Sequence, residues 1–201
     1  MLVEHEGKRP VVAESAYIAP TAVVSGDVTI GERSRILFGA VLTADGGPIE
    51  IGSTTIVMEN ALVRGRAGHP ARIGDHVLVG PHAHVNGAVV DDYAFVATGA
   101  SIFPGALVGA GAQVRINGVV QVNTSVAPDA VVPIGWIALG DPAQLFSPDQ
   151  HDVLWPIQRE LDFPRTVFGV PRAPNAELMP VVTERYADLF GSHLLDRAID
   201  E

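Results

Sequence analysis

The chain has 201 residues, which is enough for one domain with a hydrophobic core and a smaller appendage. Hydrophobic residues make up 47% and charged residues 18%, which excludes an intrinsically disordered chain. The formal charge of −10 repels phosphate backbones and anionic lipid heads, so neither nucleic acid nor a membrane is expected as a partner. There is no cysteine, so any metal ion must be held by histidine and carboxylate ligands.

No targeting or membrane segment stands out in the sequence. Residues 1–6 lack a basic segment followed by an apolar one, and no apolar stretch approaches the roughly 18 residues that span a bilayer. We therefore expect a cytoplasmic protein.

Aliphatic residues recur at every sixth position over most of residues 18–132. They are Ile18, Val24, Ile30, Ile36, Leu42, Ile51, Val57, Val63, Ile73, Val79, Val85, Val90, Val96, Ile102, Val108, Val114, Val120, Val126 and Val132. A helix would bury a residue at every third or fourth position, so the spacing favours short strands joined by turns. Three such units of about 18 residues predict one turn of a parallel β-helix, in which each coil buries its aliphatic residues on the next.

The six-residue spacing is broken between Leu42 and Ile51, between Val63 and Ile73, and between Val85 and Val90, and then it ends. An eight-residue excursion covers residues 65–72, and the six-residue spacing stops near residues 136–143. We therefore predict a β-helix domain over 1–143 and a C-terminal tail over 144–201. Ser147 and Pro148 offer an N-cap followed by a proline at the first helical position, and residues 150–161 are predicted to be helical with an interruption at Pro156. Residues 163–170 suggest extended chain, and residues 181–199 suggest an amphipathic helix that packs on the β-helix.

Several segments resemble the γ-class carbonic anhydrases of the hexapeptide-repeat superfamily. They are residues 18–31, 38–42, 47–52, 68–70, 73–77 and 139–143. The resemblance covers about the first 145 residues. It implies an all-β fold, a left-handed parallel β-helix of hexapeptide repeats followed by a helical and extended tail, and it implies a homotrimer. The wider superfamily is acyltransferase-like.

In the γ-class enzymes a zinc ion is held by three histidines at a subunit interface. The positions that match those histidines here are Arg64, Pro81 and Asn86. Arginine has no lone pair to offer, proline has no side-chain donor, and asparagine is a weak oxygen ligand. We therefore expect no zinc at the position that the resemblance implies. Two neighbouring carboxylates match acidic positions of the family, Asp45 and Glu59.

Residues at equivalent positions of successive coils should stack in columns. One predicted column contains Thr43, Arg64, Asn86 and Phe103, and a neighbouring one contains Glu59, Pro81 and Thr98. Arg64 then either forms an interface ion pair with Glu59 or Asp45, or receives a carboxylate or other small anion. His69, on the excursion, reaches over the same cleft or is a turn residue before Pro70. The candidate ligand-binding residues are Arg64, Asn86, Glu59, Asp45 and His69.

The sequence His82-Ala83-His84 is the second candidate site. Alternate residues of an extended strand leave by the same face, about 6.5 Å apart, so both imidazoles should point outward when Ala83 points inward. The pair then binds a relocated metal ion, supplies a general acid or base near pH 7, or consists of ordinary surface or interface histidines. His5, His151 and His193 lie outside the coils and are not singled out.

Four functions remain open at this stage. The first is a protein without the hydratase zinc that binds a small anionic or carboxylated ligand at inter-subunit clefts. The second is an acyltransferase that uses a CoA thioester, with His82 or His84 as general base, although the short excursion argues against it. The third is a non-catalytic scaffold or assembly subunit with the tail as partner surface. The fourth is a carbonic anhydrase with relocated metal ligands.

Overall fold

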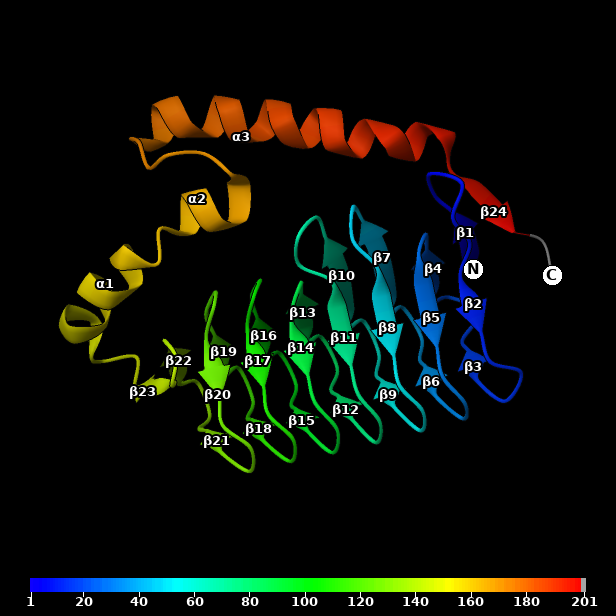
Figure 1. The fold of residues 1–201 in the computed structure, drawn as a ribbon, viewed down its shortest axis with the longest axis horizontal. Helices are drawn as coiled ribbons and strands as arrows, with labels where there is room; N and C mark the ends of the chain where they lie inside the picture. The colour runs from blue at the N-terminus through cyan, green and yellow to red at the C-terminus, as the bar shows by residue number, and fades with distance from the viewer. Residues whose placement is uncertain (200–201) are drawn as a thin grey trace.

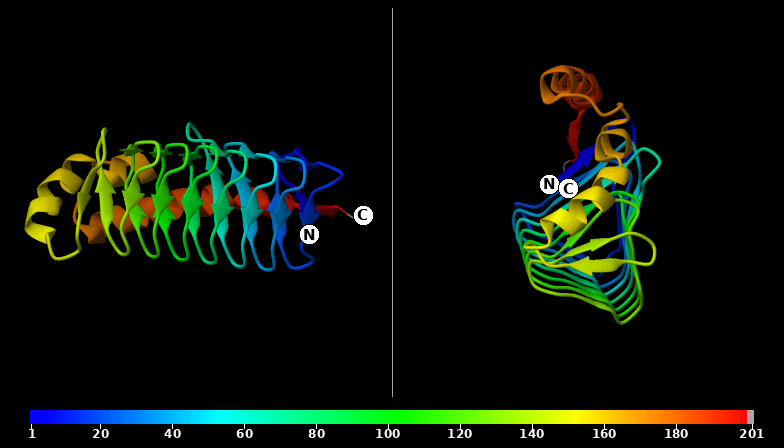
Figure 2. Two further views of the ribbon diagram at one scale, coloured as in Figure 1. Left: turned by 90° about the horizontal axis from the view of Figure 1, so that it is seen from below. Right: turned by 90° about the vertical axis from the view of Figure 1, so that its left-hand side faces the viewer.

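Short parallel strands stack in three sheets that form the sides of a triangular prism (Figures 1 and 2). The computed structural model describes residues 1–199. Each coil contributes one strand to each sheet, and the strands of successive coils pair in parallel. Val96 pairs with Val114 and Val114 with Val132, so these coils repeat every 18 residues. The predicted parallel β-helix is confirmed.

The largest sheet has ten strands in the order β23-β22-β19-β16-β13-β10-β7-β4-β1-β24. They are β1 (Leu2–Glu4), β4 (Val23–Ser25), β7 (Val41–Asp45), β10 (Leu62–Arg66), β13 (His84–Asn86), β16 (Ser101–Ile102), β19 (Val119–Val120), β22 (Ile137–Leu139), β23 (Gln144–Phe146) and β24 (Arg197–Ile199).

The other two sheets have seven strands each. One contains β2 (Val11–Val12), β5 (Val28–Ile30), β8 (Ile49–Ile51), β11 (Ala71–Ile73), β14 (Val89–Val90), β17 (Leu107–Val108) and β20 (Ser125–Val126). The other contains β3 (Tyr17–Ile18), β6 (Arg35–Ile36), β9 (Ile56–Val57), β12 (Leu78–Val79), β15 (Phe95–Val96), β18 (Gln113–Val114) and β21 (Val131–Val132).

The core of the prism is made of the aliphatic residues that define the repeat. All of them are buried except Ile18, which is partly buried and packs against the same core. Because successive coils place these residues at the same register, each side chain packs on the one above and the one below. The six-residue spacing therefore predicted the buried positions correctly.

The tail contains more helix than the sequence predicted. It consists of α1 (His151–Glu160), α2 (Phe163–Phe168), α3 (Asn175–Phe190) and the 3-10 helix η1 (Gly191–Leu195), followed by β24. Figure 1 shows α3 running alongside the stack of coils, back towards the N-terminus. Among residues 1–199, no helix is long and apolar enough to cross a membrane.

The helix predicted over residues 150–161 is confirmed as α1, His151–Glu160. Three other predictions about the tail were wrong. The first helix continues through Pro156 without interruption, because a proline there removes one hydrogen bond without ending the helix. Residues 163–170, predicted as extended, contain α2, whose Phe163 packs edge-on against Phe103 of the β-helix. The last helix begins at residue 175 and ends at residue 190, and residues 197–199 form a strand instead.

The tail is fastened to the β-helix mainly at its two ends. β23 pairs antiparallel with β22, and β24 pairs antiparallel with β1, so both edges of the ten-stranded sheet are covered by tail strands. Between them, Leu154 of α1 packs with Leu139 of β22 and Phe146 of β23, and Leu178 and Val182 of α3 form a second small cluster with Val170. Phe163 of α2 packs on Phe103, and polar contacts join α2 and α3 to β10 and η1 to β7. The contacts of α3 and η1 with β10 and β7 define the candidate site.

Candidate functional site

A column of outward-facing polar residues crosses the ten-stranded sheet beneath the tail. Register pairing joins Ser25 to Thr43, Thr43 to Arg64, and Arg64 to Asn86. These residues alternate with the buried aliphatic residues of the same strands, so their side chains leave the opposite face. Ser25, Thr43 and Asn86 are nevertheless buried. The predicted stacking of Thr43, Arg64 and Asn86 is confirmed. We call these three residues, together with Ser25, the Arg64 column.

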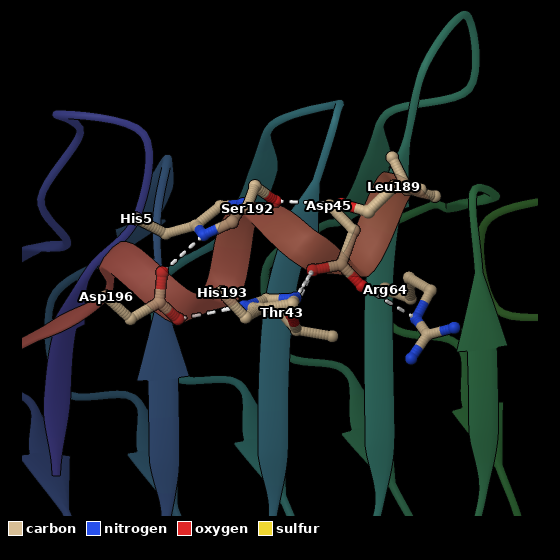
Figure 3. Close-up of polar contacts among 8 residues, drawn as sticks. All are labelled: His5, Thr43, Asp45, Arg64, Leu189, Ser192, His193 and Asp196. Atoms are coloured by element: carbon tan, nitrogen blue, oxygen red, sulfur yellow. Dashed lines mark hydrogen bonds and ion pairs between the residues drawn. The ribbon is translucent and has the colours of Figure 1, made fainter. Parts of the chain in front are cut away.

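Arg64 pairs with Asp45 of its own chain. Its Nε lies 3.2 Å from Asp45 Oδ2, and the guanidinium carbon lies 5.5 Å from the centre of the Phe190 ring of α3. The Nε is buried without a well-aligned hydrogen bond. Figure 3 shows the two terminal nitrogens turned away from Asp45. Of the two partners considered from the sequence, Asp45 is the one that lies beside Arg64 within the same chain.

Asn86, the next residue of the Arg64 column, has an unsatisfied side chain. Its Oδ1 is buried and has no hydrogen-bond partner within the described part of the chain. A buried amide oxygen without a partner costs about 1–3 kcal/mol, so such a group calls for an explanation. Arg64 and Asn86 thus place incompletely satisfied polar atoms on neighbouring strands.

His84 lies on β13, two residues before Asn86, and its ring meets Phe103 edge-on. Burial lowers the pKa of His84 below the ordinary value of 6.5, and the positive charges of Arg64 and Arg66 lower this pKa further. The imidazole is therefore neutral at pH 7, and one of its ring nitrogens keeps a lone pair.

His82 does not share a strand with His84. It occupies a corner of the coil with a φ of 57°, is exposed, and donates its backbone N–H to the carbonyl of Glu59. The expectation that both histidines leave one extended strand by the same face was wrong, because the chain turns at residues 81–82. Pro81 and Glu59 also lie at corners and away from the strands.

His69 packs on the coil beneath the excursion. Arg66 and His69 bridge the excursion by two backbone hydrogen bonds of 2.9 Å. A Cβ at Gly87 would lie 2.8 Å from the Cβ of His69, and a Cβ at Gly105 would lie 3.4 Å from its ring. His69 is therefore held against these two glycines.

Sequence reasoning missed a second group of residues beside the Arg64 column. His5, Asp45, His193 and Asp196 meet where η1 crosses β1 and β7, and we call them the His193 cluster (Figure 3). Asp196 accepts hydrogen bonds from Nδ1 of His5 at 2.6 Å and from Nδ1 of His193 at 2.8 Å. His193 Nε2 lies 3.3 Å from Asp45 Oδ1, and the two imidazoles stack with ring centres 4.4 Å apart.

The electrostatics of the His193 cluster keep Asp196 ionised. Burial alone would raise the pKa of this carboxyl, but the hydrogen bonds from His193 and His5 outweigh it and leave the pKa below its ordinary value. Asp45 accepts a hydrogen bond of 2.5 Å from the hydroxyl of Thr43. No local motif marks this cluster, because His5 follows β1, Asp45 ends β7, and His193 and Asp196 lie near the C-terminal end of the described residues, where β24 pairs with β1.

A pocket of about 330 Å³ borders the His193 cluster. Outward side chains of β1, β4 and β7 form its floor, and residues 193–198 form one wall. The buried hydroxyl of Ser25 faces this pocket without a hydrogen-bond partner among the described residues. The pocket therefore combines apolar walls with a few polar groups, as ligand sites do.

Comparison with solved structures identifies the fold. A Bacillus cereus protein provisionally called an acetyltransferase aligns over 95% of this chain and 96% of its own, with a TM-score of 0.55 and 22% identity. A hexapeptide transferase family protein from Anaplasma phagocytophilum aligns over 97% and 98%, with a TM-score of 0.53 and 21% identity. The chain thus has the left-handed β-helix fold of hexapeptide-repeat proteins, as predicted.

Comparison by sequence finds relatives with higher identity to this chain than the solved structures have. The chain is 39% identical over 102 residues to gamma carbonic anhydrase 1, mitochondrial, from Arabidopsis thaliana, and 33% identical over 102 residues to a carbonic anhydrase from Geobacillus kaustophilus. These matches cover 47% and 51% of this chain, but only 37% and 56% of the two relatives. No family model matches the chain. The resemblance to γ-class carbonic anhydrases is confirmed.

Proposed function

We propose that this γ-carbonic-anhydrase-like protein binds a small carboxylate at Arg64 and Asn86, in place of the zinc ion of the γ class. The observation that carries the proposal is the pair of incompletely satisfied side chains on β10 and β13. The terminal nitrogens of Arg64 turn away from Asp45, and the Asn86 amide oxygen has no partner in residues 1–199.

The residues at the inherited zinc position do not suit a zinc ion. Arg64 is held as a cation beside Asp45, and Asn86 is its register partner on the next strand. A guanidinium has no lone pair, and an amide oxygen is a poor ligand beside a fixed positive charge. Pro81 has no donor atom in its side chain. We therefore propose that the hydratase site has been lost from this position.

A carboxylate is the ligand class that this arrangement favours. Two terminal guanidinium nitrogens bind the two oxygens of a carboxylate in parallel, and Arg66 on the same strand adds positive charge. Neutral His84 and the Asn86 amide then supply hydrogen bonds to other polar atoms of the ligand. Because His84 carries no charge at pH 7, it neither repels nor attracts the anion. The selectivity for a carboxylate then comes from the guanidinium of Arg64.

The remaining part of the proposal is a homotrimer whose subunit contacts lie on the two seven-stranded sheets, and not on the ten-stranded sheet that carries Arg64 and Asn86. Exposed apolar side chains occur on both seven-stranded sheets, with Val11 and Leu107 on one and Tyr17 and Val131 on the other. The tail, by contrast, lies along the ten-stranded sheet. Association through the two uncovered sheets would bury these side chains. Light scattering of the purified chain measures the number of subunits directly.

Calorimetric titration with a panel of small mono- and dicarboxylates tests the binding proposal. Arg64→Gln should weaken binding at least about tenfold, since a charge-assisted bidentate contact contributes more than 1.4 kcal/mol. Arg115→Gln, which changes an exposed arginine, is the matched control and should bind as the unmodified chain does. Undiminished binding by Arg64→Gln, or no binding of any carboxylate by the unmodified chain, would overturn the proposal.

A further inference from the structure

The His193 cluster has the composition and placement of a metal site. His5 follows β1, Asp45 ends β7 and His193 lies in η1, so three separate segments bring their side chains to one point. One possible ligand atom from each of the three lies within 4.8 Å of the others. Two imidazoles and a carboxylate form a ligand set that zinc, iron and cobalt accept in proteins.

The spacing of two of these atoms already suits a tetrahedral ion. Ligands that lie about 2.0–2.1 Å from such an ion are about 3.3 Å from each other. His193 Nε2 and Asp45 Oδ1 are 3.3 Å apart. His5 offers Nε2, the ring nitrogen not bonded to Asp196, as the third ligand atom.

Asp196 orients both imidazoles. Its two carboxylate oxygens each accept one Nδ1–H, from His5 and from His193. In this tautomer each ring has its lone pair on Nε2, the atom that binds the metal. A carboxylate behind a ligating histidine is the usual outer support of a metal site, because it fixes the ring and raises its basicity.

The charges also favour a cation at this point. Asp45 and Asp196 contribute two negative charges, and Arg64 offsets one of them through its contact with Asp45. With neutral imidazoles the group retains one net negative charge. The adjoining pocket, which His193 and Thr43 line, leaves one side of the cluster open to water or a small ligand.

We propose that His5, Asp45 and His193 bind one divalent first-row transition-metal ion, with Asp196 as the orienting residue and a fourth position open to the pocket. This site is distinct from the inherited zinc position and from the relocated pair His82 and His84. It does not depend on carboxylate binding at Arg64. The alternative occupant is a proton, which would make His193 a cation held between Asp45 and Asp196.

Cobalt titration distinguishes metal from proton. Tag-free protein is stripped with a chelator and titrated with Co²⁺, whose visible absorption reports coordination by nitrogen and oxygen. We expect one Co²⁺ per chain, displaceable by Zn²⁺. Asp196→Asn should weaken binding about 10–100-fold, the usual effect of an outer-shell change, and His193→Gln should weaken it more. The His82→Ala/His84→Ala double variant is the matched control and should bind as the unmodified chain does.

A second measurement needs no variant, which matters because His193→Gln could detach the tail. Histidine ring ¹⁵N spectra of the unmodified chain are recorded with and without Zn²⁺. The resonances of His5 and His193 should shift, while those of the exposed corner histidines His76 and His82 stay in place. Absence of Co²⁺ binding, loss of binding in the His82→Ala/His84→Ala variant, or shifts confined to other histidines would overturn the proposal.

Discussion

Gly87 and Gly68 form a matched pair that tests how the 65–72 excursion is held against the coil. Both have positive φ, 56° for Gly87 and 74° for Gly68. A Cβ at Gly87 would lie 2.8 Å from the Cβ of His69 and 3.0 Å from its carbonyl oxygen, whereas a Cβ at Gly68 would meet nothing within 4 Å. Alanine therefore introduces backbone strain at both positions but a steric clash only at Gly87.

The two terms can be separated by magnitude. A left-handed backbone costs a non-glycine residue about 1–2 kcal/mol, and this term is common to both variants. Overpacking against backbone atoms typically adds about 1–3 kcal/mol, and this term applies to Gly87→Ala alone. For a chain of this length, 1 kcal/mol lowers Tm by about 2–4 °C. Gly87→Ala should therefore melt about 2–12 °C below Gly68→Ala.

Thermal unfolding at one fixed protein concentration measures the difference, because association would otherwise shift Tm. Adding His69→Gly to Gly87→Ala removes the Cβ contact and should recover part of the loss. If the two alanine variants melt together, or if Gly68→Ala is the less stable one, the close approach of His69 to Gly87 is not what positions the excursion.

Three further predictions concern the site and the core. His84 has a lowered pKa in the folded chain, so the unfolded chain binds a proton at His84 more readily, and the free energy of unfolding should fall as the pH drops from about 6.5 towards the folded-state pKa. Arg64→Gln removes a nearby positive charge and should raise the pKa of His84 in an NMR titration. An unchanged pKa would contradict this reasoning. Leu42→Ala, at a fully buried position, should cost about 2–5 kcal/mol in denaturant unfolding, against about 0.5 kcal/mol or less for exposed Leu195→Ala. Tyr186→Phe removes the hydroxyl that accepts a hydrogen bond of 3.2 Å from Arg66, and it should lower the free energy of unfolding by about 0.5–1.5 kcal/mol in the same assay. An unchanged free energy of unfolding would show that this contact does not hold α3 in place.

The β-helix could be predicted from the sequence because its signal is local. Each buried position is fixed by the six-residue spacing, and a coil packs only on its neighbours, so residues such as Val96 and Val114 could be assigned without any long-range information. The stacking of Thr43, Arg64 and Asn86 followed from the same register. The partner of Arg64 could be narrowed to two carboxylates but not chosen, because the choice depends on side-chain direction.

The tail and the His193 cluster could not be predicted for the opposite reason. Residues 163–168 include β-branched and aromatic side chains that favour extended chain, yet they form α2, which has Pro164 in its first turn and packs Phe163 edge-on against Phe103. His5 and Asp196 are brought together by strands from the two ends of the chain. Local spacing carries no information about such a contact.

The tail pairs with both edges of the ten-stranded sheet, so its length must match the number of coils. From β22 to β1 the sheet has seven inter-strand steps of about 4.8 Å, a length of about 34 Å. The 16 residues of α3 and the five of η1 together extend about 34 Å as well. A chain that gained or lost one coil would leave β24 one strand spacing away from β1. The combined length of α3 and η1 thus restricts how many coils the chain can hold, although the repeat itself could be extended by further coils.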